Sequence, residues 1–207
     1  MIRNIVFDMG QVLLRYDPML PCRRHADTPE QAQTLLDTVF NAPEWADRMD
    51  RGTMSHADFV ALVQSRLQTP QLRQMAAALL EDWILDALYP IGGMEELART
   101  LHAADYKLYV LSNMSLRFRE IEYKLPAYEL FSGALVSAEE LLVKPDEAIF
   151  HRLCEKFGLK ASECLFVDDN PQNIESAKRV GMMGYCIEDW DVERLAAYLE
   201  GALDVKL

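Results

Sequence analysis

The chain has 207 residues, of which 50% are hydrophobic and 26% are charged, a composition typical of a soluble globular protein and unlike that of a disordered or membrane-spanning chain. Its 21 Lys and Arg residues stand against 33 Asp and Glu residues, which gives a formal net charge of −12 at pH 7. This excess of negative charge disfavours nucleic acids and anionic lipid surfaces as partners, so an anionic substrate has to be held by local cations.

We do not expect the beginning of the chain to be a signal peptide. Residues 1–7 are too short and too soon interrupted for a signal peptide, and no apolar run approaches the ~20 residues that a membrane helix needs. We therefore expect a cytoplasmic protein without a membrane partner. Nothing in the sequence predicts a protein partner.

Five short runs rich in β-branched and aromatic residues predict strands in chain order. Most of them are almost continuously apolar, which favours strands covered on both faces, as in a parallel sheet. Helical patterns separate them from residue 92 onward, with Asp146 and Asn170 as capping residues and Gly158 and Gly181 as helix stops. This alternation predicts an α/β fold with a doubly wound, Rossmann-like parallel sheet. The predicted strands are residues 2–7, 107–111, 134–136, 164–167 and 184–187.

Residues 16–88 follow another pattern, since they contain helix starts and no convincing strand. Thr28-Pro29-Glu30-Gln31 and Ser55-His56-Ala57-Asp58 are typical of helix amino termini, and apolar residues recur at helical spacing after each of them. Residues 89–93, rich in Pro and Gly, are predicted to be a return linker. We therefore predict a core domain of residues 1–15 and 89–207, interrupted by an inserted all-α domain of residues 16–88.

Polar residues directly follow three of the predicted strands. Asp8 follows the first strand, Ser112 and Asn113 follow the second, and Asp168-Asp169 follow the fourth. Because the carboxyl ends of parallel strands meet at one edge of a sheet, where such sheets bind their ligands, we expect these side chains to lie together. Lys144, which precedes a proline after an apolar stretch, is a lone cation well placed to join them.

The chemistry of this set is specific, although each member alone has an ordinary explanation. A strand-end Asp is commonly a helix cap or turn former, and a lone lysine is usually solvated. Neighbouring carboxylates repel unless a cation lies among them, however, and hard oxygen ligands without His or Cys favour Mg²⁺. Lys144 and the Ser112 hydroxyl supply a charge and a donor for a phosphoryl oxygen. A carboxylate nucleophile, Mg²⁺ and a lysine are the parts that phosphoryl transfer through an aspartyl-phosphate needs.

In this order the motifs resemble those of the haloacid dehalogenase superfamily, in the branch with an α-helical cap of the C1 type inserted after the first strand. Asp8 corresponds to the nucleophile of that family, Ser112 to its second motif, Lys144 to its third and Asp168-Asp169 to its acidic fourth motif. The Arg51-Gly52-Thr53-Met54-Ser55 segment is similar to a cap turn of related phosphatases. The start of the chain also resembles a sub-branch of bacterial sugar-phosphate phosphatases of subfamily IA.

Gly10 departs from the family pattern. Most phosphatases of the family carry a second Asp there, which acts as general acid for the leaving alcohol and as base for the attacking water. The resemblance implies that the Gly10 carbonyl still binds Mg²⁺ together with Asp8 and Asp169, with Asp168 as a weaker or outer ligand. Gln11 and Asp17 are candidates for supplying the missing proton, and a glycine at this position suits a positive φ.

Three functions are compatible with these residues. The first is a Mg²⁺-dependent phosphatase of a small phosphorylated metabolite, for instance a sugar phosphate, in which Asp8 attacks phosphorus while Ser112, Asn113 and Lys144 hold the phosphoryl oxygens. The second is a 2-haloacid dehalogenase, which also lacks the second Asp but needs no metal and typically carries Ser and Asn where this chain has two Asp residues. The third is a catalytically silent binding module, supported only by Gly10. The acidic pair favours the phosphatase, because it makes sense only with a cation.

Overall fold

The computed structural model describes residues 1–203, 205 and 206 and contains a five-stranded parallel sheet in the order β5-β4-β1-β6-β7. Its strands form because almost continuously apolar segments are covered on both faces. In β1, Ile5 and Phe7 pack into one apolar cluster, whereas Val6 packs into the other. The strands are β1 Asn4–Phe7, β4 Lys107–Ser112, β5 Phe131–Val136, β6 Cys164–Asp168 and β7 Met183–Cys186.

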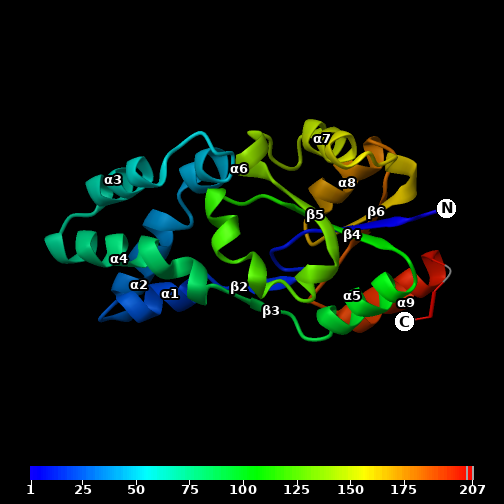
Figure 1. The fold of residues 1–207 in the computed structure, drawn as a ribbon. Helices are drawn as coiled ribbons and strands as arrows, with labels where there is room; N and C mark the ends of the chain where they lie inside the picture. The colour runs from blue at the N-terminus through cyan, green and yellow to red at the C-terminus, as the bar shows by residue number, and fades with distance from the viewer. Residues whose placement is uncertain (204, 207) are drawn as a thin grey trace.

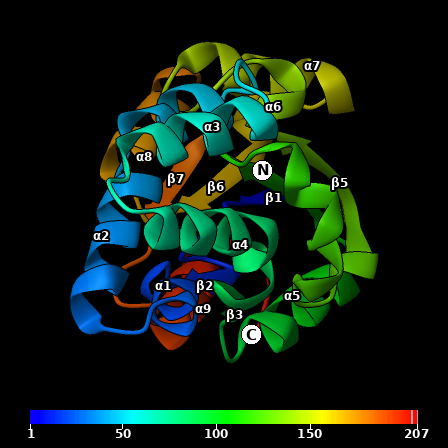
Figure 2. The ribbon, with the colours of Figure 1, turned by 90° about the vertical axis from the view of Figure 1, so that its left-hand side faces the viewer.

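Helices cover both faces of this sheet, as Figures 1 and 2 show. α5 (Met94–Ala103) and α9 (Val192–Ala202) belong to one apolar cluster, and α7 (Glu147–Phe157) and α8 (Pro171–Arg179) belong to the other. The predicted caps are present: Asp146 accepts a hydrogen bond from the Ala148 amide, and Asn170 accepts one from the Gln172 amide. The doubly wound α/β fold is thereby confirmed, and a short helix, α6 (Ser137–Glu140), follows β5.

Four further helices lie together on the side of the sheet away from both chain ends (Figure 1). They are α1 (Met19–His25), α2 (Pro29–Val39), α3 (His56–Arg66) and α4 (Pro70–Asp86), with a π-helical turn at Trp45–Met49 between α2 and α3. Thr28 and Ser55 cap α2 and α3 as the sequence predicts. The division into a core and an inserted domain of residues 16–88 stays a prediction. Within the described part of the chain, no helix is both long and apolar enough to cross a membrane.

The expectation of a strand-free insertion followed by a plain linker is wrong at both ends. β2 (Leu14–Tyr16) and β3 (Leu88–Pro90) pair as a two-stranded antiparallel sheet where the four helices join the rest of the fold. Each strand has only three residues, too few for a periodic signal. Their pairing joins segments separated by the whole insertion, so it depends on tertiary contact and not on local preference.

Candidate active site

The carboxyl edge of the sheet brings the predicted residues together. Asp8 directly follows β1, Ser112 ends β4, and Asp168 ends β6. β1 lies between β4 and β6, so Asp8 stands between the other two residues along this edge. Lys144 comes from the loop between α6 and α7 and reaches the same point.

Lys144 connects the two buried carboxylates. Its Nζ lies 2.7 Å from Asp8 Oδ1 and 2.7 Å from Asp168 Oδ2, and it donates a further hydrogen bond of 3.0 Å to the Leu111 carbonyl. Only 4% of Lys144 is exposed. Burial acts to lower the pKa of this lysine, but the charges of Asp8 and Asp168 outweigh it and leave the pKa above its ordinary value. The ammonium group is therefore charged and fixed in place.

Asp8 is a carboxyl whose negative charge is disfavoured by burial. Burial raises its pKa to about 7; the charge of Lys144 opposes this rise, while the charge of Asp168 adds to it. Its Oδ1 also accepts a hydrogen bond of 2.7 Å from the Met9 amide. Among the described residues, Oδ2 has no partner, which leaves that oxygen free to attack a substrate.

Asp168 and Asp169 have different surroundings. Asp168 is fully buried, and its oxygens accept hydrogen bonds from Lys144, from the Asn170 amide and from the side chain of Asn173. The Asp169 residue is exposed, and in the described part of the chain its carboxylate has no hydrogen-bond donor other than its own backbone amide. Asp169 therefore has free lone pairs for a ligand, whereas Asp168 mainly positions Lys144.

This cluster fits a divalent cation. Carboxylate oxygens of Asp8, Asp168 and Asp169 lie within 4.8 Å of one another, and no His or Cys belongs to the group. Three carboxylates and one lysine leave two negative charges in excess when all are ionised, a charge that a divalent cation balances. Hard oxygen donors of this kind suit Mg²⁺. The assignment of Asp8, Gly10, Asp168 and Asp169 as metal ligands stays a prediction.

Ser112 and Asn113 serve the site in different ways. Ser112 is 1% exposed and its hydroxyl, which has no hydrogen-bond partner among the described residues, lines a small pocket together with Asp8. The Asn113 side chain is already engaged, because it donates to the Lys144 carbonyl and accepts from the Lys144 amide at 2.9 and 2.8 Å. Only the backbone amide of Asn113 is then available to a phosphoryl oxygen. Its side chain positions the lysine loop.

Gly10 has no special backbone requirement. Its φ is not positive, and a Cβ placed there meets no atom within 4 Å. The two candidate substitutes for the missing acid are engaged elsewhere. Both polar atoms of the Gln11 side chain are hydrogen-bonded, to Tyr16 and to Trp190, and Asp17 accepts a hydrogen bond from the Met19 amide. Neither lines the pocket beside Asp8.

A pocket of about 110 Å³ lies between the sheet edge and the inserted helices. One wall of this pocket is formed by residues of the inserted segment for which the sequence predicted no functional role. They are Tyr16, Trp45, Asp50, Trp83 and Leu88. The only local signal for Asp50 is its position just before the Arg51-Gly52 turn. Asn173 was also missed, and its signal is weak, because an Asn in the first turn of a helix is usually a capping residue.

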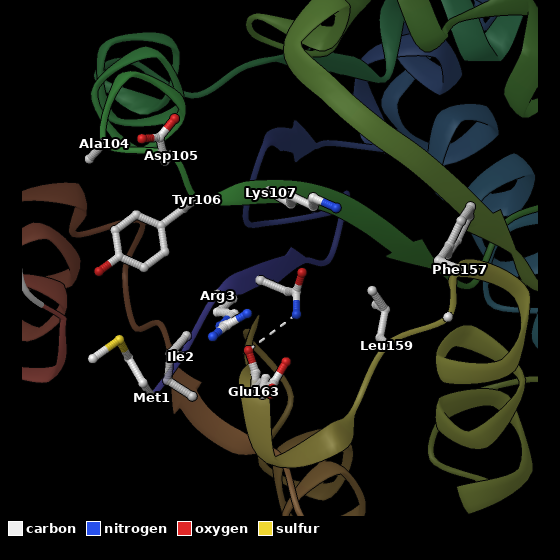
Figure 3. A pocket seen from close by; sticks show the side chains of 12 residues that line it. Met1, Ile2, Arg3, Ala104, Asp105, Tyr106, Lys107, Phe157, Leu159 and Glu163 are labelled. Atoms are coloured by element: carbon white, nitrogen blue, oxygen red, sulfur yellow. Dashed lines mark hydrogen bonds between the residues drawn. The ribbon is translucent and has the colours of Figure 1, made fainter.

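A second hollow, of about 500 Å³, lies at the opposite edge of the sheet (Figure 3). Arg3, Lys107 and Glu163 contribute to its lining, and the Asn4 side chain donates a hydrogen bond of 3.3 Å to the Glu163 carbonyl there. This hollow adjoins the amino ends of β1 and β4, whereas parallel sheets bind ligands at the carboxyl ends of their strands. The pocket at Asp8 is therefore the candidate active site.

Comparison with known proteins agrees with this fold. The model of the haloacid dehalogenase-like hydrolase family matches residues 2–181. The chain belongs to this family, as its motifs predict, and it is a hydrolase.

Among curated proteins, the chain is similar to the sesquiterpene phosphatase astK of Aspergillus oryzae, with 28% identity over 188 residues that cover 89% of each chain. It is also similar to (S)-2-haloacid dehalogenase 4A of Burkholderia cepacia, with 25% identity over 189 residues that cover 87% of this chain and 80% of the dehalogenase. Among solved structures, a family enzyme of Bacteroides thetaiotaomicron, an aspartate-to-alanine variant in complex with magnesium and inorganic phosphate, superposes with a TM-score of 0.71 and 20% identity. The match covers 93% of this chain and 99% of that one. This last similarity supports the fold alone.

Proposed function

We propose that the protein is a Mg²⁺-dependent phosphatase that hydrolyses a small phosphorylated metabolite through an aspartyl-phosphate on Asp8. The observation that carries the proposal is the arrangement of Asp8, which lies beside a buried lysine and an acidic cluster and faces a pocket with the free Ser112 hydroxyl. The similarity to a phosphatase over 89% of the chain supports it.

In the proposed reaction the Asp8 carboxylate attacks phosphorus and the new bond joins the carboxyl oxygen to phosphorus, while the ester bond breaks and its electron pair leaves with the alkoxide, which takes a proton from water. Lys144, the Ser112 hydroxyl and the Asn113 amide hold phosphoryl oxygens and offset their charge. Water then attacks phosphorus, the bond from phosphorus to the Asp8 oxygen breaks, and inorganic phosphate and the Asp8 carboxylate are released. Asp8, the Gly10 carbonyl and Asp169 would hold Mg²⁺, which would supply neutralising charge for the phosphoryl group.

The dehalogenase is the second candidate, because a 2-haloacid dehalogenase is among the relatives and Gly10 leaves no second acid beside Asp8. The acidic cluster argues against it. Asp169 is exposed beside Asp8 and has no cationic side chain as a hydrogen-bond partner in the described structure, so it repels a haloacid anion unless a metal ion is bound.

The test is a panel of phosphate esters and 2-haloacids, assayed for released phosphate and halide with Mg²⁺ and with excess chelator. We expect phosphate release that chelator abolishes. Asp8→Asn, which keeps the shape of the side chain and removes the attacking charge, should lower kcat by about 10⁴-fold or more while the protein stays folded. Halide release that is indifferent to chelator would establish the dehalogenase instead.

A further inference from the structure

The pocket above Asp8 has an aromatic wall. Tyr16, Trp45 and Trp83 all line it, and their rings meet at steep angles. The Trp45 and Trp83 centroids are 4.9 Å apart with 72° between the ring planes, and those of Tyr16 and Trp83 are 6.3 Å apart at 75°. The Tyr16 hydroxyl has no hydrogen-bond partner among the described residues. These residues therefore form one packed aromatic cluster on this wall of the pocket.

Asp50 adds a carboxyl to the same wall. Among the described residues it is, apart from Asp8, the one charged side chain that lines the pocket, and no Lys or Arg of that part of the chain lines it. Burial raises the pKa of Asp50 well above its ordinary value, although a hydrogen bond from the Ser115 amide opposes the rise. Asp50 lies on the wall that the inserted segment supplies, whereas Asp8 and Ser112 belong to the edge of the sheet. Asp50 is therefore available to the part of a substrate that extends from its phosphate toward the inserted segment.

The backbone around Asp50 is held against the sheet domain. The Asp50 carbonyl accepts a hydrogen bond from the Ser137 hydroxyl. Two residues later, Gly52 has a φ of +75° and approaches Ala138 so closely that a Cβ would lie 2.3 Å from the Ala138 carbonyl oxygen. A side chain on such a fixed turn can act as a specificity element, because its position costs little entropy to maintain.

The charge and the size of the pocket restrict the substrates that it can bind. An aromatic wall with a carboxyl and no cation offers no partner to a second phosphate or a carboxylate, and it attracts a positive charge, which in turn favours the ionised form of Asp50. The pocket has a volume of about 110 Å³. A pocket of this size favours a compact alcohol over an extended one.

We propose that the substrate of the phosphatase proposed above is the phosphate ester of a small amino alcohol, whose ammonium group lies against Tyr16, Trp45 and Trp83 and pairs with Asp50. The phosphate then lies at Asp8, Ser112 and Lys144, and the short carbon chain spans the pocket. A bound ammonium group offsets the burial of the Asp50 carboxylate, and the aromatic faces stabilise it by cation–π contact. This inference rests on the proposed function for its chemistry, and on the pocket alone for its selectivity.

The test compares phosphocholine with its neutral isostere 3,3-dimethylbutyl phosphate, each assayed with Mg²⁺ for phosphate release. The wild-type protein should prefer phosphocholine in kcat/KM by about 30-fold or more, mainly through KM. Asp50→Asn should reduce this preference by about 10-fold and change turnover of the neutral ester by less than about 3-fold. Asp47→Asn is the matched control, because Asp47 is an exposed acid of the same turn that does not line the pocket.

A second variant and a binding measurement keep the outcome clear. Trp45→Leu should also lower the preference for the charged ester, and choline alone should bind to the wild-type protein with a change in tryptophan fluorescence that Asp50→Asn weakens. Equal loss of both esters in Asp50→Asn would make Asp50 a proton donor or a structural residue and overturn the inference, as would equal use of both esters by the wild type. Choline binding without hydrolysis of any ester would support the pocket assignment and contradict the phosphatase.

Discussion

Lys144 is the cation on which the charge balance of the site depends, so its removal tests the electrostatic reasoning directly. Its Nζ is 2.7 Å from one oxygen of Asp8 and 2.7 Å from one oxygen of Asp168, and all three residues are buried. Lys144→Met keeps the length of the side chain and leaves two carboxylates without their counter-charge. Breaking a buried ion pair by removing one partner costs about 3–5 kcal/mol. In a protein of this size that corresponds to a fall in Tm of about 6–20 °C.

The assay is thermal unfolding in chelator at pH 7.5, with Lys178→Met as control. Lys178 forms an exposed pair with Glu175 at 2.9 Å, so its removal should change stability by less than about 0.5 kcal/mol. Because Lys144 holds the pKa of Asp8 down, the variant should take up a proton at Asp8 more readily, and its deficit should shrink at pH 5.5. A loss below about 1 kcal/mol at pH 7.5, or an undiminished loss at pH 5.5, would refute the reasoning.

Three further results are expected. In chelator the wild-type protein should lose stability as the pH rises from 5 to 8. The pKa of Asp8 is raised from 3.8 to about 7, so between these two pKa values the folded state binds more protons than the unfolded state. Denaturant unfolding across this pH range checks the prediction, and Asp8→Asn should flatten the dependence of stability on pH. Asp169→Ala should weaken Mg²⁺ binding by about 100-fold in calorimetry, with little loss of stability. Asp168→Ala removes a fully buried carboxylate and should lower the free energy of unfolding by about 3 kcal/mol. Gly10→Asp, which meets no steric obstacle, should raise kcat/KM for alkyl phosphates over aryl phosphates by about 10²-fold if a proton donor is missing there; an unchanged alkyl-to-aryl ratio would show that another group already supplies the proton.

Most of the fold could be predicted from local sequence patterns, because these patterns reflect burial and backbone hydrogen bonding over a few residues. The apolar runs of β1 and β6 indicate strands buried on both faces, and Thr28, Ser55, Asp146 and Asn170 mark helix starts through hydrogen bonds that span only two or three residues. β2 and β3 could not be predicted in this way. Their six residues become strands only because the insertion returns to where it left the sheet, which places Arg15 opposite Tyr89.

The sequence by itself determined the family, the order of its motifs and the edge of the sheet where they meet. The order of the motifs can be read directly from the chain, and the ends of the strands follow from local composition. Only the tertiary structure separated the roles within that set. It showed that the Asn113 side chain holds the Lys144 backbone, that Asp168 is saturated with hydrogen bonds while Asp169 is not, and that Asp50 faces the pocket of Asp8. These roles depend on which lone pairs remain free after folding and on which distant segments meet, and neither property is encoded in the spacing of residues along one chain.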